Sequence, residues 1–129
     1  MGGLRNLRQI FFAAPFLIGT WFGIGQPDDK GNMWIARMGA DGSFHAQFRS
    51  CFKGKGLEQF APGHWQLNGD TETINLTGVD GRPFSREDIY KVLSHDAQKQ
   101  VYRYLLTGFV YTSHRVADDF QMPSCETIS

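Results

Sequence analysis

The sequence predicts an all-β fold, an up-and-down antiparallel barrel of about eight or nine strands. Apolar and polar residues alternate along most of the chain with a period of two, as they do in a strand that buries one face. Turn-forming residues separate these runs at intervals of about 8–12 residues. A first run opens at Gly19-Thr20-Trp21. The clearest later runs cover residues 44–48, 65–67, 74–76, 90–92, 102–104 and 109–111.

The turns between these runs favour hairpins that join neighbouring strands. Asp41-Gly42, Asn68-Gly69-Asp70 and Asp80-Gly81-Arg82-Pro83 combine residues that accept a positive φ or fix a tight bend. Gly54 and Gly56 indicate a looser loop, and residues 94–98 a further connection. Closing the sheet into a barrel would leave no exposed strand edge.

Length and composition indicate one globular domain. The chain has 129 residues, of which 41% are hydrophobic and 14% aromatic. Its 13 Lys and Arg residues balance its 13 Asp and Glu residues. Nucleic acid is therefore not an expected partner, because binding it requires a positively charged face.

The N-terminal segment has a different pattern. Leu4, Leu7 and Phe11 follow helical spacing, and Pro15 should end that helix near Ala14. We expect residues 1–15 to form a helical plug over one end of a barrel domain at 16–122, followed by a tail at 123–129. A secretory signal is the alternative interpretation. No apolar run reaches the length of a membrane-spanning helix.

The alternation allows two choices of interior face. Burying the aromatic set leaves His45, Gln47, Arg49, Gln66 and Asn75 in water, which avoids the cost of unpaired buried polar groups. The opposite choice gives a polar cavity lined by His45, Arg49, His64 and Gln66, suited to an anion. We expect the first arrangement, with these residues facing inward: Phe44, Phe48, Trp65, Tyr90, Val92, Tyr102, Tyr104, Phe109 and Tyr111.

Motifs for catalysis and metal binding are not found in the sequence. There is no G-x-S-x-G elbow and no glycine-rich phosphate loop. Asp118-Asp119 and Glu87-Asp88 are adjacent carboxylates, which on a strand point to opposite faces, so we expect them in solvated loops. The four histidines lack the spacing of a metal site. We therefore expect no enzyme activity, no metal and no cofactor.

Several short motifs resemble a known family. Leu17-Ile18-Gly19-Thr20-Trp21 resembles the G-x-W first-strand motif of lipocalins. Asp41-Gly42-Ser43-Phe44, Gly63-His64-Trp65, Ile89-Tyr90-Lys91-Val92 and Phe109-Val110-Tyr111, which leads to Arg115, follow the order seen in small bacterial lipocalin-like domains of the calycin type. The resemblance covers residues 16–120. It implies that Trp21 packs against Arg115 as a structural pair.

The resemblance also bears on the two cysteines. Many lipocalins tie the C-terminal tail to the barrel wall with a disulfide, and Cys51 and Cys125 suit that role. A bridge would imply a periplasmic or secreted protein. Two free thiols, in a cytoplasmic protein, are the alternative.

The resemblance implies non-covalent binding of a small apolar or amphipathic molecule inside the barrel. One alternative is a filled barrel that serves as a structural or interaction module. Another is a haem-binding barrel of the nitrobindin type, because residues 19–25 resemble its G-x-W-x-G-x-G start and His114 lies late in the chain. The expected ligand-binding residues are Phe44, Phe48, Trp65, Tyr90, Tyr102, Tyr104 and Tyr111.

Overall fold

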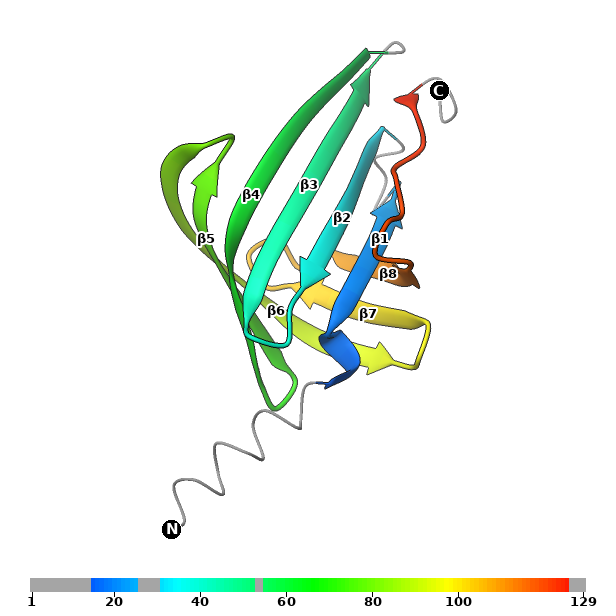
Figure 1. Ribbon diagram of the computed structural model, residues 1–129. Coiled ribbons are helices and arrows are strands. Elements are labelled where there is room, and N and C mark those ends of the chain that lie inside the picture. The colour runs from blue at the N-terminus through cyan, green and yellow to red at the C-terminus, as the bar shows by residue number, and fades with distance from the viewer. Residues whose placement is uncertain (1–14, 26–30, 53–54, 126–129) are drawn as a thin grey trace.

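Each strand pairs with the strands before and after it in sequence, and the last pairs with the first (Figure 1). The computed structural model describes residues 15–25, 31–52 and 55–125. Within these residues it has eight antiparallel strands in a closed up-and-down barrel, which confirms the predicted architecture. The strands are β1 Gly19–Ile24, β2 Asn32–Met38, β3 Ser43–Phe52, β4 Lys55–Asn68, β5 Thr71–Val79, β6 Arg82–His95, β7 Lys99–Tyr104 and β8 Val110–Val116.

The predicted N-terminal plug is not supported. Residues 1–14 of it lie outside the described residues. The described chain begins with one short 3₁₀ turn, η1 Pro15–Leu17, which leads directly into β1. Leu17 is fully buried at this end of the barrel and packs in the same apolar cluster as Trp21 and Trp65.

One end of the barrel is closed by large side chains. Two tryptophan side chains there donate hydrogen bonds to backbone carbonyls, one in η1 and one in the β2–β3 connection. Trp21 donates its Nε1–H to the carbonyl of Leu17 at 2.9 Å, and Trp65 donates to the carbonyl of Gly39 at 2.9 Å. Leu67 and Val92 complete the floor of this cluster. Since each buried indole N–H has an acceptor, the end closes without an unpaired donor.

The seam between β1 and β8 is short. Three residue pairs join the two strands, and the middle pair sets Trp21 opposite Arg115. Arg115 donates to the carbonyls of Phe16 and Ile18, at 2.5 and 2.7 Å, and so holds the chain that enters β1. A third bond, to the carbonyl of Ala97 at 2.9 Å, holds the connection before β7.

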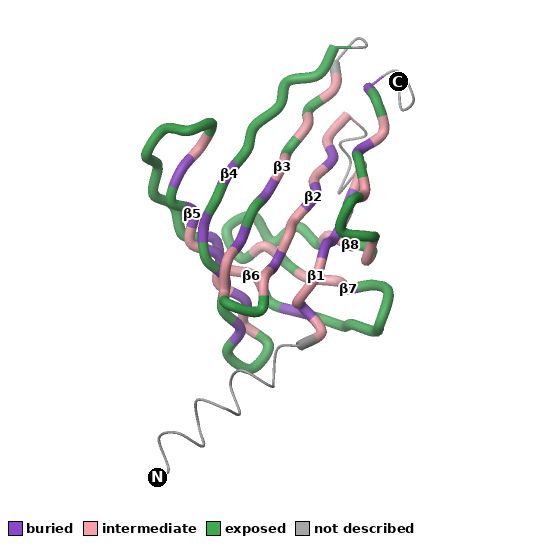
Figure 2. The backbone as a smooth tube through the Cα atoms, in the orientation of Figure 1, coloured by how far each residue is buried: buried purple, intermediate pink, exposed green. Residues whose placement is uncertain are grey.

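A second apolar cluster lies outside the barrel, on the outer face of β1 and β2. Met33 and Ile35 alternate with inward-facing residues of β2, yet both are buried. The C-terminal tail covers them: Phe120 and Met122 pack on this face, and the Phe22 and Phe120 ring centres are 4.9 Å apart. The tail runs alongside β1 in Figure 1, and Figure 2 shows buried segments on both.

The covered outer face explains why the sequence did not indicate β2. Its apolar residues point both ways, so no alternation appears. A second difference concerns Phe109, which was expected to face inward on the last strand. The chain still turns at Gly108, where φ is +79°, and β8 begins only at Val110. Phe109 therefore lies in the connection, and its side chain is exposed.

Candidate functional site

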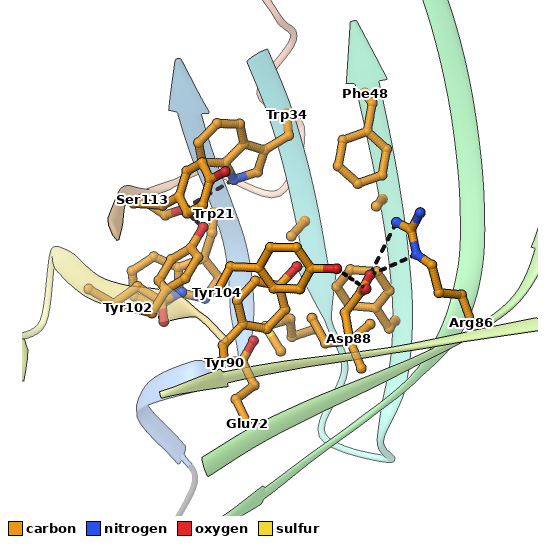
Figure 3. A pocket seen from close by; sticks show the side chains of 17 residues that line it. Trp21, Trp34, Phe48, Glu72, Arg86, Asp88, Tyr90, Tyr102, Tyr104 and Ser113 are labelled. Carbon is orange, nitrogen blue, oxygen red and sulfur yellow. Dashed lines mark hydrogen bonds and ion pairs between the residues drawn. The ribbon is translucent and has the colours of Figure 1, made fainter. Parts of the chain in front are cut away.

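The barrel interior contains a cavity of about 210 Å³ above the Trp21 floor (Figure 3). Most of its wall is apolar or aromatic, as is usual for small-molecule sites. At its outer end it adjoins a second hollow between β3–β4 and β5–β6, lined in part by Phe48, Phe84 and Arg86. The aromatic residues of the wall are Trp21, Trp34, Phe44, Phe48, Tyr90, Tyr102, Tyr104 and Tyr111.

Small residues on β2 and β3 leave this space open, and a third, on β4, lines the second hollow. Ala36 on β2 pairs with Ala46 on β3, and Ala46 pairs with Ala61 on β4. Across the barrel the wall is built from tyrosines of β6, β7 and β8. Because the methyl groups of Ala36 and Ala46 are short, the native side chains leave this level of the interior unfilled.

Two polar side chains lie at the deep end of the cavity. Glu72 is the second residue of β5 and Gln100 the second residue of β7, so both lie near the closed end. They are 5% and 3% exposed. Glu72 Oε2 and Gln100 Oε1 have no hydrogen-bond partner within the described part of the chain. Burial raises the pKa of Glu72 from 4.5 to about 7, since its ionised form has lost water.

A second polar group stands nearer the mouth. Asp88 on β6 is buried and accepts a hydrogen bond from the Tyr104 hydroxyl at 2.7 Å. Its other oxygen lies 3.2 Å from both Nε and a terminal nitrogen of Arg86, whose side chain is 53% exposed. Asp88 thus belongs to the interior, which corrects the expectation that it solvates a loop. Its carboxylate is paired with the guanidinium of Arg86 at the entrance.

Hydrogen bonds and ring contacts fix the aromatic wall. Ser113 Oγ accepts a bond from Trp34 Nε1 at 3.2 Å and lies 2.8 Å from the Tyr102 hydroxyl. Tyr90 meets Tyr102 edge to face, with ring centres 5.4 Å apart. Burial is the main cause that raises the pKa of both tyrosines, so their hydroxyls stay neutral. The cavity therefore has ordered, uncharged aromatic walls.

The structure separates the expected ligand-binding residues into two groups. Phe44, Phe48, Tyr90, Tyr102, Tyr104 and Tyr111 line the cavity together. Trp65 is not among the residues of the cavity wall, and it packs in the apolar cluster at the closed end, to which Phe44 also belongs. The aromatic set thus faces inward, apart from Phe109.

The alternative prediction, a polar cavity suited to an anion, is wrong. His45, His64 and Gln66 are exposed, because they occupy the outward positions of β3 and β4. Arg49, which has the same parity as His45, pairs with Glu58 and donates to the carbonyl of Pro123 at 2.9 Å. These side chains therefore cannot line an interior anion site.

Other residues singled out from the sequence are placed as follows. Arg115 lies over the indole of Trp21, with its guanidinium carbon 4.3 Å from the ring centre. Cys51 and Cys125 form a disulfide, with Cα atoms 5.3 Å apart. His114 is exposed and adjoins the inward-facing Ser113, so it faces away from the cavity. In the described ranges no cluster of three or more His, Cys, Asp or Glu side chains could hold a metal ion.

The sequence analysis missed Glu72, Asp88 and Gln100, although the alternation contained the signal for all three. Glu72 has the parity of Ile74 and Leu76, two residues expected on one face of a strand. Asp88 has the parity of Tyr90, and Gln100 that of Tyr102. Each of these residues lies two positions before an inward-facing residue, so continuing the alternation by one period would have placed all three inside the barrel.

Comparison with protein-family models, curated proteins and solved structures finds no match to this chain. Among the described residues, no helix is long and apolar enough to cross a membrane. The geometry of the interior is therefore the basis for assigning a function.

Proposed function

We propose that this chain is a lipocalin-like binding protein that holds a small amphipathic molecule non-covalently inside its barrel. The observation that carries the proposal is the cavity of about 210 Å³, which is closed at the Trp21 end and walled by aromatic rings. A barrel of about eight strands has room for one small ligand or for filling side chains. The alanines of β2 and β3 in the cavity wall favour the ligand over a filled interior.

The energetics favour binding of a partly apolar molecule. Burying about 200 Å² of apolar ligand surface gains about 5 kcal/mol before the costs of association. The polar groups at the floor and at the mouth would then fix the ligand's orientation, as in other concave sites. The proposal assigns no catalytic step to any residue.

A titration with N-phenylnaphthylamine, an apolar fluorophore whose aryl nitrogen stays uncharged, tests the proposal. We expect saturable fluorescence enhancement with one fluorophore per chain. The Phe48→Trp variant should change the affinity severalfold, because Phe48 lies at the cavity wall near its outer end. Phe60→Trp is the matched control, since Phe60 is 52% exposed and is not among the residues of the cavity wall. No enhancement, or equal effects of the two variants, would contradict the proposal.

A further inference from the structure

We infer that the interior site takes an aromatic or apolar molecule carrying a protonated amine, with its ammonium group at Glu72 and Gln100 and its apolar body towards Phe48. The inference depends on the proposed function and specifies the class of ligand. It starts from the two buried oxygens at the cavity floor that have no partner in the described chain.

A ligand with several N–H donors would satisfy both oxygens. Glu72 Oε2 and Gln100 Oε1 are acceptors, and a buried acceptor without a donor costs about 1–3 kcal/mol. An ammonium group has three donors and no acceptor. Rotating the Gln100 amide would present a donor in place of its oxygen, so Glu72 decides the charge of the ligand.

The charges around the cavity also favour a cation at the floor. Among the described residues of the cavity wall the one cation is Arg86, and it pairs with Asp88 near the mouth. Arg115 lies against Trp21, where its guanidinium donates to three backbone carbonyls and is absent from the wall. Burial is the cause of the raised pKa of Glu72, and within the described ranges no ion pair joins its carboxyl to a cation. An anionic head group at this depth would instead be repelled by the carboxylate of Glu72.

Aromatic rings beside Glu72 add to this preference. Tyr90 pairs with Glu72 directly across β5 and β6, and Tyr102 meets Tyr90 edge to face. The charge of Glu72 contributes to the raised pKa of both tyrosines, so both lie within its field. A cation over a tyrosine ring gains about 0.5–2 kcal/mol, more when it is desolvated.

Binding should couple to the ionisation of Glu72. The titratable groups that face it are Tyr90 from β6 and Tyr102 from β7, both neutral, while β4 places Leu67 opposite it. Because its pKa is about 7, the carboxyl is largely protonated below neutral pH. An ammonium ligand then has to displace that proton, so its affinity should fall as the pH falls below about 7.

Three indoles with nearly the same body and different charge provide the test. Tryptamine is cationic, tryptophol is neutral and indolepropionate is anionic. Each is used to displace N-phenylnaphthylamine from the full chain at about pH 8, where Glu72 is ionised. We expect tryptamine to bind about tenfold or more tightly than tryptophol, and indolepropionate most weakly.

Two variants locate the effect. Glu72→Gln keeps the size of the side chain and removes the charge, so the preference for tryptamine should disappear while the fluorophore still binds. Glu87→Gln is the matched control, since Glu87 is exposed on β6. If the fluorophore binds but tryptamine has no advantage, or keeps it in Glu72→Gln, the amine assignment is overturned and the binding function survives. If the fluorophore does not bind to the parent chain, both proposals fail.

Discussion

Trp21 and Arg115 lie directly opposite each other across the β1–β8 seam, with the guanidinium carbon 4.3 Å from the centre of the indole ring. The pair joins the first strand to the last, and the arginine also bonds to the carbonyls of Phe16 and Ile18. Charge-assisted bonds to the backbone and a cation–π contact thus meet at the point where the barrel closes.

Replacing this arginine should weaken the whole barrel. We expect Arg115→Ala to lower the free energy of unfolding by about 3 kcal/mol, because it removes the ring contact and leaves the half-buried carbonyls of Phe16 and Ile18 unpaired. Arg115→Lys should recover only part of the loss, since an ammonium cannot reproduce the planar fork. Urea unfolding followed by circular dichroism measures both. Arg103→Ala, at an exposed position of β7, is the control, and an equal loss there would refute the role of the pair.

The disulfide should contribute strongly to stability. Cys51 and Cys125 are 74 residues apart, and a bridge of that span adds about 4 kcal/mol in the chain-entropy model. Replacing both cysteines with alanine should therefore lower the unfolding midpoint. It should also increase proteolysis after Phe120, because the tail would leave the outer face of Met33 and Ile35. An unchanged midpoint and digestion pattern would show that packing alone holds the tail.

Filling the cavity should abolish binding without loss of the fold. Ala46 faces the cavity between two other alanines, so Ala46→Leu adds three carbons to its wall. We expect the affinity for N-phenylnaphthylamine to fall about tenfold or more, while the unfolding free energy changes by about 1 kcal/mol or less. His45→Leu places the same side chain at the neighbouring exposed position. If His45→Leu weakens binding equally, the fluorophore binds elsewhere.

The unoccupied protein should lose stability as the pH rises. The pKa of Glu72 is about 7 in the folded chain and 4.5 in the unfolded chain, so the folded state binds more protons between these values. The unfolding free energy should fall by about 3 kcal/mol from pH 4.5 to pH 7 on account of this group, and change no further above that range. Urea titrations of the parent chain and Glu72→Gln over this range isolate the effect. Parallel pH profiles would contradict it.

The sequence predicted the barrel because alternation and turn chemistry act locally. Asp80 and Gly81 show this well: both have positive φ, 52° and 80°, as a two-residue hairpin requires. The β2 strand was missed for a reason that is not local. Met33 and Ile35 face outward and are buried by Phe120 and Met122, which lie far along the chain. No short window contains both partners.

The aromatic wall of the candidate site was predicted better than its polar floor. Parity alone places Tyr90, Tyr102 and Tyr111 on one face. Glu72 and Gln100 were not identified from the sequence, and their buried, unpaired oxygens depart from the general rule that polar groups are costly to bury. Departures from such rules are expected where a protein binds something. Phe109 is exposed because the β7–β8 connection extends up to it, and alternation in the sequence does not determine where a connection ends.

The disulfide between Cys51 and Cys125 affects how the protein responds to a pulling force. If the oxidised protein is stretched by its two ends, the force passes through the disulfide, and the chain between the two cysteines bears none of it. Only the segments before Cys51 and after Cys125 can then lengthen. Strands β1, β2 and β3 up to Cys51 would be pulled away while β4 to β8 bear no tension, so a pulling experiment should record a much shorter extension than the same experiment in a reductant.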